Sequence, residues 1–150
     1  MHAGTPLSTA PARGVINGGA HRYPLRVYYE DTDAGGIVYY ANYLRYIERA
    51  RSDIVEQIGL DQRAMREEGL VFVVTRVEAD YLGAARFGDR LEVQTTHQAE
   101  GPVRWVFDQD VLRDGKVIFR AKVTAVCMTT GGKPTRLPAK LRLSDGDPAR

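Results

Sequence analysis

The residues with the clearest chemical potential lie in one short turn, the segment DTDAGG at residues 31–36, just ahead of a long amphipathic stretch. A carboxylate in such a turn lies close to the unpaired N–H groups and partial positive charge of the helix N-terminus that follows. The two kinds of group could act together on an acyl carbonyl. The carboxylate would attack the carbonyl or activate water, and the amides would stabilise the oxyanion.

The same turn admits other interpretations. Asp and Gly are common in turns that carry no function. A calcium loop would need a bidentate acid at the twelfth position from Asp31, and Asn42 stands there. An aspartate of phosphoryl transfer could also follow a strand, but that chemistry is usual on parallel sheets and the strands downstream are predicted to be antiparallel. On the residues alone, a purely structural turn and acyl chemistry both stay open.

Composition limits the remaining classes. The 150 residues are 43% hydrophobic and 27% charged, which suits one soluble domain with a sizeable core. A net charge of +2, with no dense basic and aromatic stretch, argues against a nucleic-acid partner. No apolar run reaches the roughly 20 residues of a membrane helix, and the N-terminus lacks the apolar stretch of a secretory signal. The single cysteine, Cys127, excludes an internal disulfide and fits a cytoplasmic location.

The two ends of the chain differ in composition from its centre. Residues 1–22 are rich in Gly, Ala, Pro, Ser and Thr, and residues 142–150 are similarly polar. Such compositions are typical of flexible segments. We therefore expect one folded domain over residues 23–141.

A strand is predicted over residues 23–29 and a long helix over residues 42–58. One face of the helix is apolar at three- and four-residue steps and comprises Tyr43, Leu44, Ile47, Ala50, Ile54, Val55 and Ile58. Asn42 is the expected N-cap and Gly59 the left-handed C-terminal residue. Arg49 and Asp53 are expected to pair on the exposed face.

After a short helix over residues 61–68, capped by Asp61, the hydrophobic period changes to two. Strands are predicted over residues 70–81, 91–97, 103–111 and 117–128, with an Asp114-Gly115 hairpin before the last. Short connections make these strands antiparallel, and the long helix is the only predicted element able to cover their apolar face. The expected fold is α+β, a curved antiparallel sheet of about five strands around one central helix.

The turn and the helix start resemble those of the hotdog-fold acyl-CoA thioesterases. The pattern comprises Tyr29, Thr32, Asp33, Gly36, Val38, Tyr39 and Tyr43, followed by Glu48-Arg49-Ala50-Arg51. It is most similar to the Tol-Pal-associated thioesterases and more distantly to the 4-hydroxybenzoyl-CoA thioesterases. The resemblance covers roughly residues 23–141 and implies the same fold that the periodicity predicts.

The resemblance implies roles for individual residues. Asp33 matches the catalytic carboxylate, and the backbone N–H of Tyr40 matches the group that polarises the thioester carbonyl. The implied substrate-binding residues are Tyr29, Thr32, Gly36, Val38 and Tyr43. Many Tol-Pal-type members carry His at the position of Tyr40, whereas tyrosine is the pattern of the hydroxybenzoyl-type enzymes.

These assignments predict hydrolysis of a short-chain aliphatic or aryl acyl-CoA, or of an acyl-carrier-protein thioester, without a metal or other cofactor, since coenzyme A is part of the substrate. The family implies a homodimer or homotetramer. Acyl hydration is an alternative, although those enzymes pair His with an acid and this motif has no His. A second alternative is a non-catalytic or acyl-carrier-protein-binding hotdog protein linked to the Tol-Pal envelope system.

The other reactive residue types are assigned structural roles. His97 is predicted to be a partly buried strand residue, Cys127 a small core residue, and His2 and His21 inert groups near the N-terminus. Trp105 and Phe107 are expected to fill the packed face of the sheet. Four basic residues could meet coenzyme A phosphates but are predicted to be surface charges: Arg76, Arg86, Arg120 and Lys133.

Overall fold

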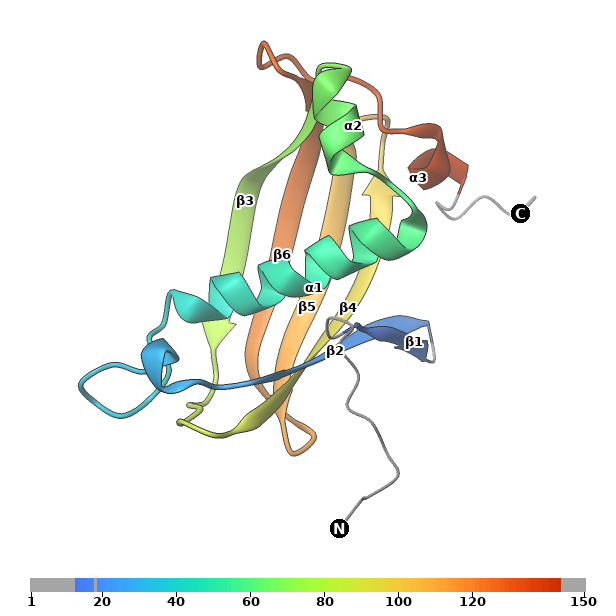
Figure 1. The fold of residues 1–150 in the computed structure, drawn as a ribbon. Helices are drawn as coiled ribbons and strands as arrows, with labels where there is room; N and C mark the ends of the chain where they lie inside the picture. Colours follow the sequence, from blue (N-terminus) through green and yellow to red (C-terminus); the bar gives the residue numbers. More distant parts are fainter. Residues whose placement is uncertain (1–12, 18, 144–150) are drawn as a thin grey trace, which may run out of the picture.

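A curved antiparallel sheet with one long helix lying across it organises the chain (Figure 1). The computed structural model describes residues 13–17 and 19–143. Its elements in chain order are β1 (Val15–Asn17), β2 (Ala20–Arg26), the 3₁₀ helix η1 (Tyr29–Asp31), α1 (Asn42–Ile58), α2 (Gln62–Glu67), β3 (Leu70–Tyr81), β4 (Arg90–Glu100), β5 (Arg104–Arg113), β6 (Lys116–Thr129) and α3 (Ala139–Leu143). The strand order is β1-β2-β4-β5-β6-β3, and every neighbouring pair is antiparallel.

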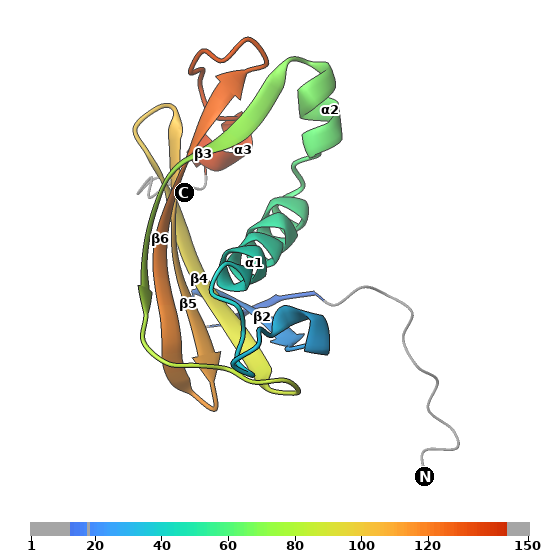
Figure 2. The ribbon, with the colours of Figure 1, turned by 90° about the vertical axis from the view of Figure 1, so that its left-hand side faces the viewer.

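Helix α1 covers one face of the sheet, as Figure 2 shows from the side. Its buried residues are Tyr43, Tyr46, Ile47, Ala50, Asp53, Ile54 and Val55. They pack against inward-facing residues of the sheet such as Trp105, Phe107 and Val123, all at most 2% exposed. Each fully buried large apolar side chain contributes about 1.5–3 kcal/mol. The predicted α+β fold is confirmed, with six strands in place of about five.

Several local predictions are confirmed and others are wrong. Gly59 ends α1 with a φ of 90°, and the Asp61 side chain accepts from the Ala64 amide at the start of α2, both as predicted. The N-cap of α1 is Ala41, because the Asn42 side chain instead donates to a loop carbonyl. Leu44 is 40% exposed, since it faces away from the sheet.

The N-terminal part of the sheet begins earlier than predicted. The expected strand over residues 23–29 is β2, which starts at Ala20 and ends at Arg26, and β1 pairs with it ahead of the predicted domain boundary. The start of this hairpin lies in a segment rich in Gly and Ala, and its packing depends on a distant helix residue, Asp53, so local patterns did not predict it. Flexible segments were predicted over residues 1–22 and 142–150; of these, residues 1–12, 18 and 144–150, with His2 among them, lie outside the described residues. Helix α3 extends past the predicted C-terminal boundary at residue 141.

Strand β3 is one edge of the sheet and pairs only with β6 within the described residues. It spans 12 residues, with Val73, Val74, Val77 and Tyr81 between 38% and 46% exposed. A long apolar edge of this kind offers unpaired N–H and C=O groups to another strand. The opposite edge, β1, spans only three residues.

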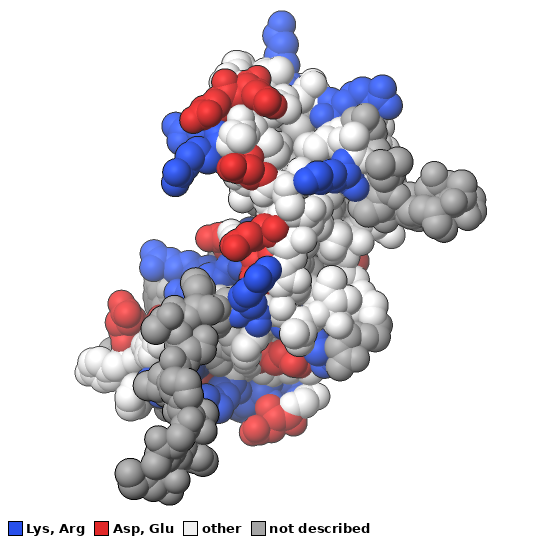
Figure 3. All heavy atoms as spheres, turned by 45° about the vertical axis from the view of Figure 1, so that its right-hand side comes forward, with Lys and Arg blue, Asp and Glu red and all other residues white. Residues whose placement is uncertain are grey.

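The surface and the helices set few further constraints. Figure 3 shows basic and acidic side chains interspersed on one face of the molecule. In the described ranges, no helix is long and apolar enough to cross a membrane.

Candidate active site

The turn at residues 31–36 holds Asp33 in a closed loop. The Asp33 amide donates to the Ile37 carbonyl at 2.9 Å, and its carbonyl accepts from the Gly36 amide at 3.0 Å. Its carboxylate oxygen Oδ1 accepts from the Gly35 amide at 2.8 Å. Gly36 adopts a φ of 81°, which an L-residue with a side chain rarely does. The loop therefore presents an exposed carboxylate in a defined position.

The other carboxylate of this turn, Asp31, is buried and holds the loop together. Its side chain accepts from the Tyr28 amide at 2.8 Å. Its carbonyl accepts from the Tyr39 amide at 2.9 Å and from the Asn42 side chain at 2.8 Å. The Tyr46 hydroxyl lies near this carboxylate without a hydrogen bond of normal geometry, and burial together with the Asp31 charge raises the Tyr46 pKa well above its ordinary value. Asp31 thus has a structural role.

The Tyr40 amide lies at the start of α1 and is free. No acceptor for its N–H is found within the described part of the chain. The Tyr40 carbonyl accepts from the Tyr81 hydroxyl at 2.9 Å, which ties this position to the end of β3. The Tyr40 side chain is 61% exposed. The free amide and the exposed Asp33 carboxylate therefore belong to one loop at the positive end of the helix.

The remaining predicted site residues fall into two groups. Thr32 and Gly36 lie in the same loop, and the exposed Tyr29 ring meets the Phe87 ring edge-on at 6.1 Å. Val38 and Tyr43 are each 3% exposed. They pack in the core behind the loop, so within one protomer they support its position and do not face solvent.

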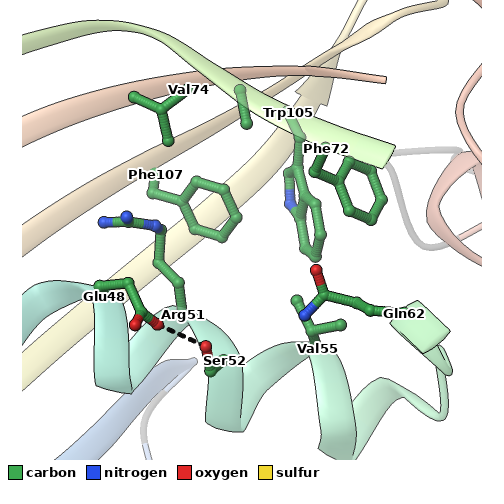
Figure 4. A pocket seen from close by; sticks show the side chains of 10 residues that line it. Glu48, Arg51, Ser52, Val55, Gln62, Phe72, Val74, Trp105 and Phe107 are labelled. Atoms are coloured by element: carbon green, nitrogen blue, oxygen red, sulfur yellow. Dashed lines mark hydrogen bonds between the residues drawn. The ribbon is translucent and has the colours of Figure 1, made fainter. Parts of the chain in front are cut away.

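A cavity of about 220 Å³ lies between α1 and the sheet (Figure 4). Three aromatic rings line it, from Phe72, Trp105 and Phe107, with centroids 5.3 Å apart for the first pair and 4.6 Å for the second. The other lining residues are Glu48, Arg51, Ser52, Val55, Gln62, Val74 and Ala125. The cavity borders the N-terminal half of β3, whereas the Tyr40 loop lies at the C-terminal end of that strand.

The sequence missed a buried polar cluster under the C-terminal half of α1. His21 and Asp53 are 3% and 8% exposed, and Nε2 of the histidine lies 2.6 Å from Oδ2 of the aspartate. The same Oδ2 accepts from the Gly14 amide at 2.8 Å and from the Gln57 side chain at 2.7 Å. The predictions of an inert His21 and of an exposed Arg49–Asp53 pair are therefore wrong.

A signal for this cluster was present in the spacing. Asp53 follows the buried Tyr46 and Ala50 at helical steps of seven and three residues, on the same stripe. Arg49 instead lies over the Tyr46 ring, 5.6 Å from its centroid.

Other structural predictions are confirmed. Cys127, Trp105 and Phe107 are at most 2% exposed. His97 is partly buried, and its Nδ1 accepts from the Trp105 indole at 3.0 Å.

The candidate basic residues do not form one cluster. Arg86 flanks the Asp33 turn, because its backbone pairs with Ile37. Arg76 and Arg120 form exposed ion pairs with neighbouring carboxylates. Within the described residues, no group of three or more His, Cys, Asp or Glu side chains is arranged to hold a metal ion.

The profile of the thioesterase-like superfamily matches residues 27–143, which contain the turn, α1 and most of the sheet. The chain belongs to this superfamily. It is 38% identical over 122 residues to the acyl-CoA thioester hydrolase YbgC of Escherichia coli, covering 80% of this chain and 91% of that protein. The acyl-CoA thioesterase YbgC of Haemophilus influenzae is likewise 38% identical over 122 residues, covering 80% of this chain and 90% of the relative.

Solved structures of the superfamily share the fold. A 1,4-dihydroxy-2-naphthoyl-CoA thioesterase from Synechocystis superposes with a TM-score of 0.80 at 24% identity, covering 88% of this chain and 99% of that one. The 4-hydroxybenzoyl-CoA thioesterase of Pseudomonas gives 0.76 at 22% identity, covering 84% and 99%. The predictions of a hotdog fold and of a thioester hydrolase are confirmed.

Proposed function

We propose that the chain hydrolyses acyl-CoA thioesters at the loop ahead of α1. The observation that carries this proposal is the exposed Asp33 carboxylate in the same short loop as the free Tyr40 amide. The names of the curated relatives support coenzyme A thioesters as the substrate. A cytoplasmic location stays a prediction from the single cysteine.

In the proposed mechanism the thioester carbonyl oxygen accepts from the Tyr40 N–H, which stabilises the oxyanion as it forms. Asp33 then attacks the carbonyl carbon and expels the thiolate, giving a mixed anhydride that water hydrolyses. Alternatively, Asp33 takes a proton from a water molecule that attacks the carbon directly. A thiolate leaves readily, so neither route requires a strong acid, and neither uses a metal or an added cofactor.

We further propose a homodimer formed by antiparallel pairing of two β3 edges. The length and apolar exposure of this edge support such pairing. In each copy the Tyr40 loop is tied to the C-terminal end of β3, and the aromatic cavity borders its N-terminal half. Antiparallel pairing would bring opposite ends of the two strands together. The Tyr40 amide of one copy would then face the aromatic cavity of the other, which would hold the acyl group.

A panel of thioesters with detection of the released thiol tests the function. The panel comprises short aliphatic acyl-CoAs, aryl acyl-CoAs and acyl-carrier-protein thioesters. We expect turnover of at least one acyl-CoA class, and no thiol release from any member would overturn the proposal. Single-turnover hydrolysis in oxygen-labelled water separates the two routes, since label enters the Asp33 carboxylate only through the anhydride.

The variant Val77→Asp tests the dimer. It places like charges along the β3 edge, so we expect monomers in sedimentation and loss of most thiol release. The matched control is Val15→Asp on the opposite edge, where the side chain is 64% exposed. A wild-type protein that sediments as a monomer at micromolar concentration would contradict the proposed assembly.

A further inference from the structure

The motif Glu48-Arg49-Ala50-Arg51 includes a charged side chain that the proposed reaction does not use. The Arg51 guanidinium extends into the aromatic cavity (Figure 4). Its carbon Cζ lies 5.9 Å from the centroid of the Phe107 ring. Burial lowers the Arg51 pKa from its ordinary value, and the Glu48 charge opposes this effect. A cation in such a place requires partners, because removing a charge from water is costly.

Within the described chain, Arg51 has a single hydrogen-bond partner. Its Nη1 donates to Oε1 of Gln109 at 3.0 Å. No carboxylate lies within 4.0 Å of it among the described ion pairs. The nearby Glu48 carboxylate is taken by the Ser52 hydroxyl at 2.5 Å, the contact drawn in Figure 4. Since a guanidinium has five N–H donors, most of those of Arg51 stay available.

The one partner of Arg51 is itself held rigidly. Gln109 is 1% exposed, and its Nε2 donates to the Ile47 carbonyl and to the Thr95 hydroxyl, each at 3.0 Å. These two bonds fix which side of the amide faces Arg51. The guanidinium is therefore anchored on one side, and its remaining donors are available to a molecule in the cavity.

The walls of the cavity favour a flat apolar body beside this cation. Phe72, Trp105 and Phe107 present rings, and the indole N–H of Trp105 is already used by His97. Aromatic rings stack well on one another and on guanidinium planes. A volume of about 220 Å³ suits a group the size of a single ring.

We infer that Arg51 is a specificity-determining residue that selects aromatic acyl groups carrying an oxygen acceptor, a hydroxyl or a carboxylate, on the ring. The ring lies among the three aromatic side chains, and the substituent accepts from the free N–H groups of Arg51. This inference rests on the proposed function, in which the acyl group of a thioester enters the cavity.

The test compares the specificity constants of benzoyl-CoA, 4-hydroxybenzoyl-CoA and 4-carboxybenzoyl-CoA. A hydrogen bond to a charged group favours the substituted substrates about tenfold or more over benzoyl-CoA in the wild type. Arg51→Met brings this ratio close to one. The control Arg45→Met removes an exposed arginine from the same helix and keeps the wild-type ratio. Arg51→Lys keeps the positive charge but lacks the planar guanidinium, so it should lower the ratio as well. This second variant keeps the test decisive if Arg51→Met folds poorly.

A binding experiment separates this inference from the proposed function. Trp105 is the only tryptophan, so its fluorescence reports directly on the cavity. Benzoate, which carries a ring carboxylate, quenches it at lower concentration than toluene, which has no oxygen acceptor, in the wild type, and this difference is lost in Arg51→Met. Hydrolysis without preference between the three thioesters would overturn the inference and leave the function standing. Selective quenching without any hydrolysis would overturn the function and leave the selective cavity standing.

Discussion

Asp33 lies in the loop ahead of α1 and Asp53 in the C-terminal half of that helix, and the surroundings of these two carboxylates are opposite. Asp33 is exposed and its side chain accepts one hydrogen bond, from the Gly35 amide of its own turn. Asp53 is 8% exposed and one of its oxygens accepts from His21, Gly14 and Gln57. The first has lone pairs to offer to a reaction. The second uses its Oδ2 oxygen to fasten the N-terminal hairpin to the helix.

The difference shows how a carboxylate acquires a structural or a chemical role. Donors from distant parts of the chain satisfy a buried carboxylate, and their bonds make it a cross-link. A carboxylate held only by its own turn keeps its position without losing its reactivity. Four substitutions test this contrast, in decreasing order of expected effect.

Asp33→Asn removes the group that attacks or acts as base. We expect the specificity constant for thioester hydrolysis to fall about 10²- to 10⁴-fold, while the melting temperature stays within about 1 °C of the wild type. Kinetics by thiol detection and a thermal melt check the two parts. Asp114→Asn, in the exposed β5–β6 turn, is the matched control and should retain activity. Wild-type turnover in Asp33→Asn would contradict the assignment of Asp33 as the catalytic carboxylate.

Asp53→Ala leaves the buried His21 and Gly14 groups without their acceptor, while the half-buried Gln57 side chain keeps its bond to the Gly14 carbonyl. We expect the free energy of unfolding to fall by about 3 kcal/mol, measured by urea denaturation. Activity per folded molecule should stay near the wild-type value, because Asp53 lies away from the loop. A strong loss of activity with unchanged stability would reverse the contrast between the two carboxylates.

Gly36→Ala forces a side chain into the left-handed conformation of the Asp33 turn. No atom lies within 4 Å of the added Cβ, so the cost is backbone strain of about 1 kcal/mol. We expect a lower melting temperature together with reduced turnover, since the strained turn displaces Asp33. Gly115→Ala, at a φ of 77° in the β5–β6 hairpin, should lose similar stability with unchanged turnover. Equal turnover in both variants would show that the turn need not hold Asp33 in place.

The smallest effect is expected for His97, which lies near the Asp53 cluster and makes stability depend on pH. Burial lowers the His97 pKa, and the neighbouring His21 adds to this. Because the unfolded chain then binds the proton more readily, the stability from this group is complete above about pH 6.5 and is lost as the pH falls from there toward the lowered pKa of the folded state. Between pH 7.5 and pH 5.5 the free energy of unfolding, measured by urea denaturation, should fall less in His97→Asn than in the wild type. The asparagine side-chain oxygen can still accept from Trp105. An equal loss in both proteins would contradict this assignment.

The sequence predicted the parts of the fold that follow from local periodicity. The helix over residues 42–58, the long strands and the Gly59 end were all visible in spacing and turn residues. The β1–β2 hairpin was missed because its placement depends on Asp53, a residue far along the chain. The prediction of Asn42 as the N-cap was wrong for a similar reason, because its side chain donates to the Asp31 carbonyl across the loop. Periodicity reports which face is apolar, and it does not report which polar group finds a distant partner.

The aromatic cavity shows the same limit for the site. The resemblance pointed to Asp33 and Tyr40, which lie close together in the sequence. Phe72, Trp105 and Arg51 come from three separate elements, and no local pattern links them. Their proximity arises only when β5 and β3 lie on either side of β6 beneath the helix.

The pairing of β2 has a consequence for the order in which the chain folds. Strand β2 lies between β1 and β4, and its register sets Leu25 opposite Leu91, with α1, α2 and β3 intervening in the sequence. Closing so long a loop is entropically costly and slows folding. During synthesis β2 leaves the ribosome well before β4, so it stays without this partner until β4 is made. Its Arg22, Pro24 and Arg26 make it a poor template for mispairing during that time.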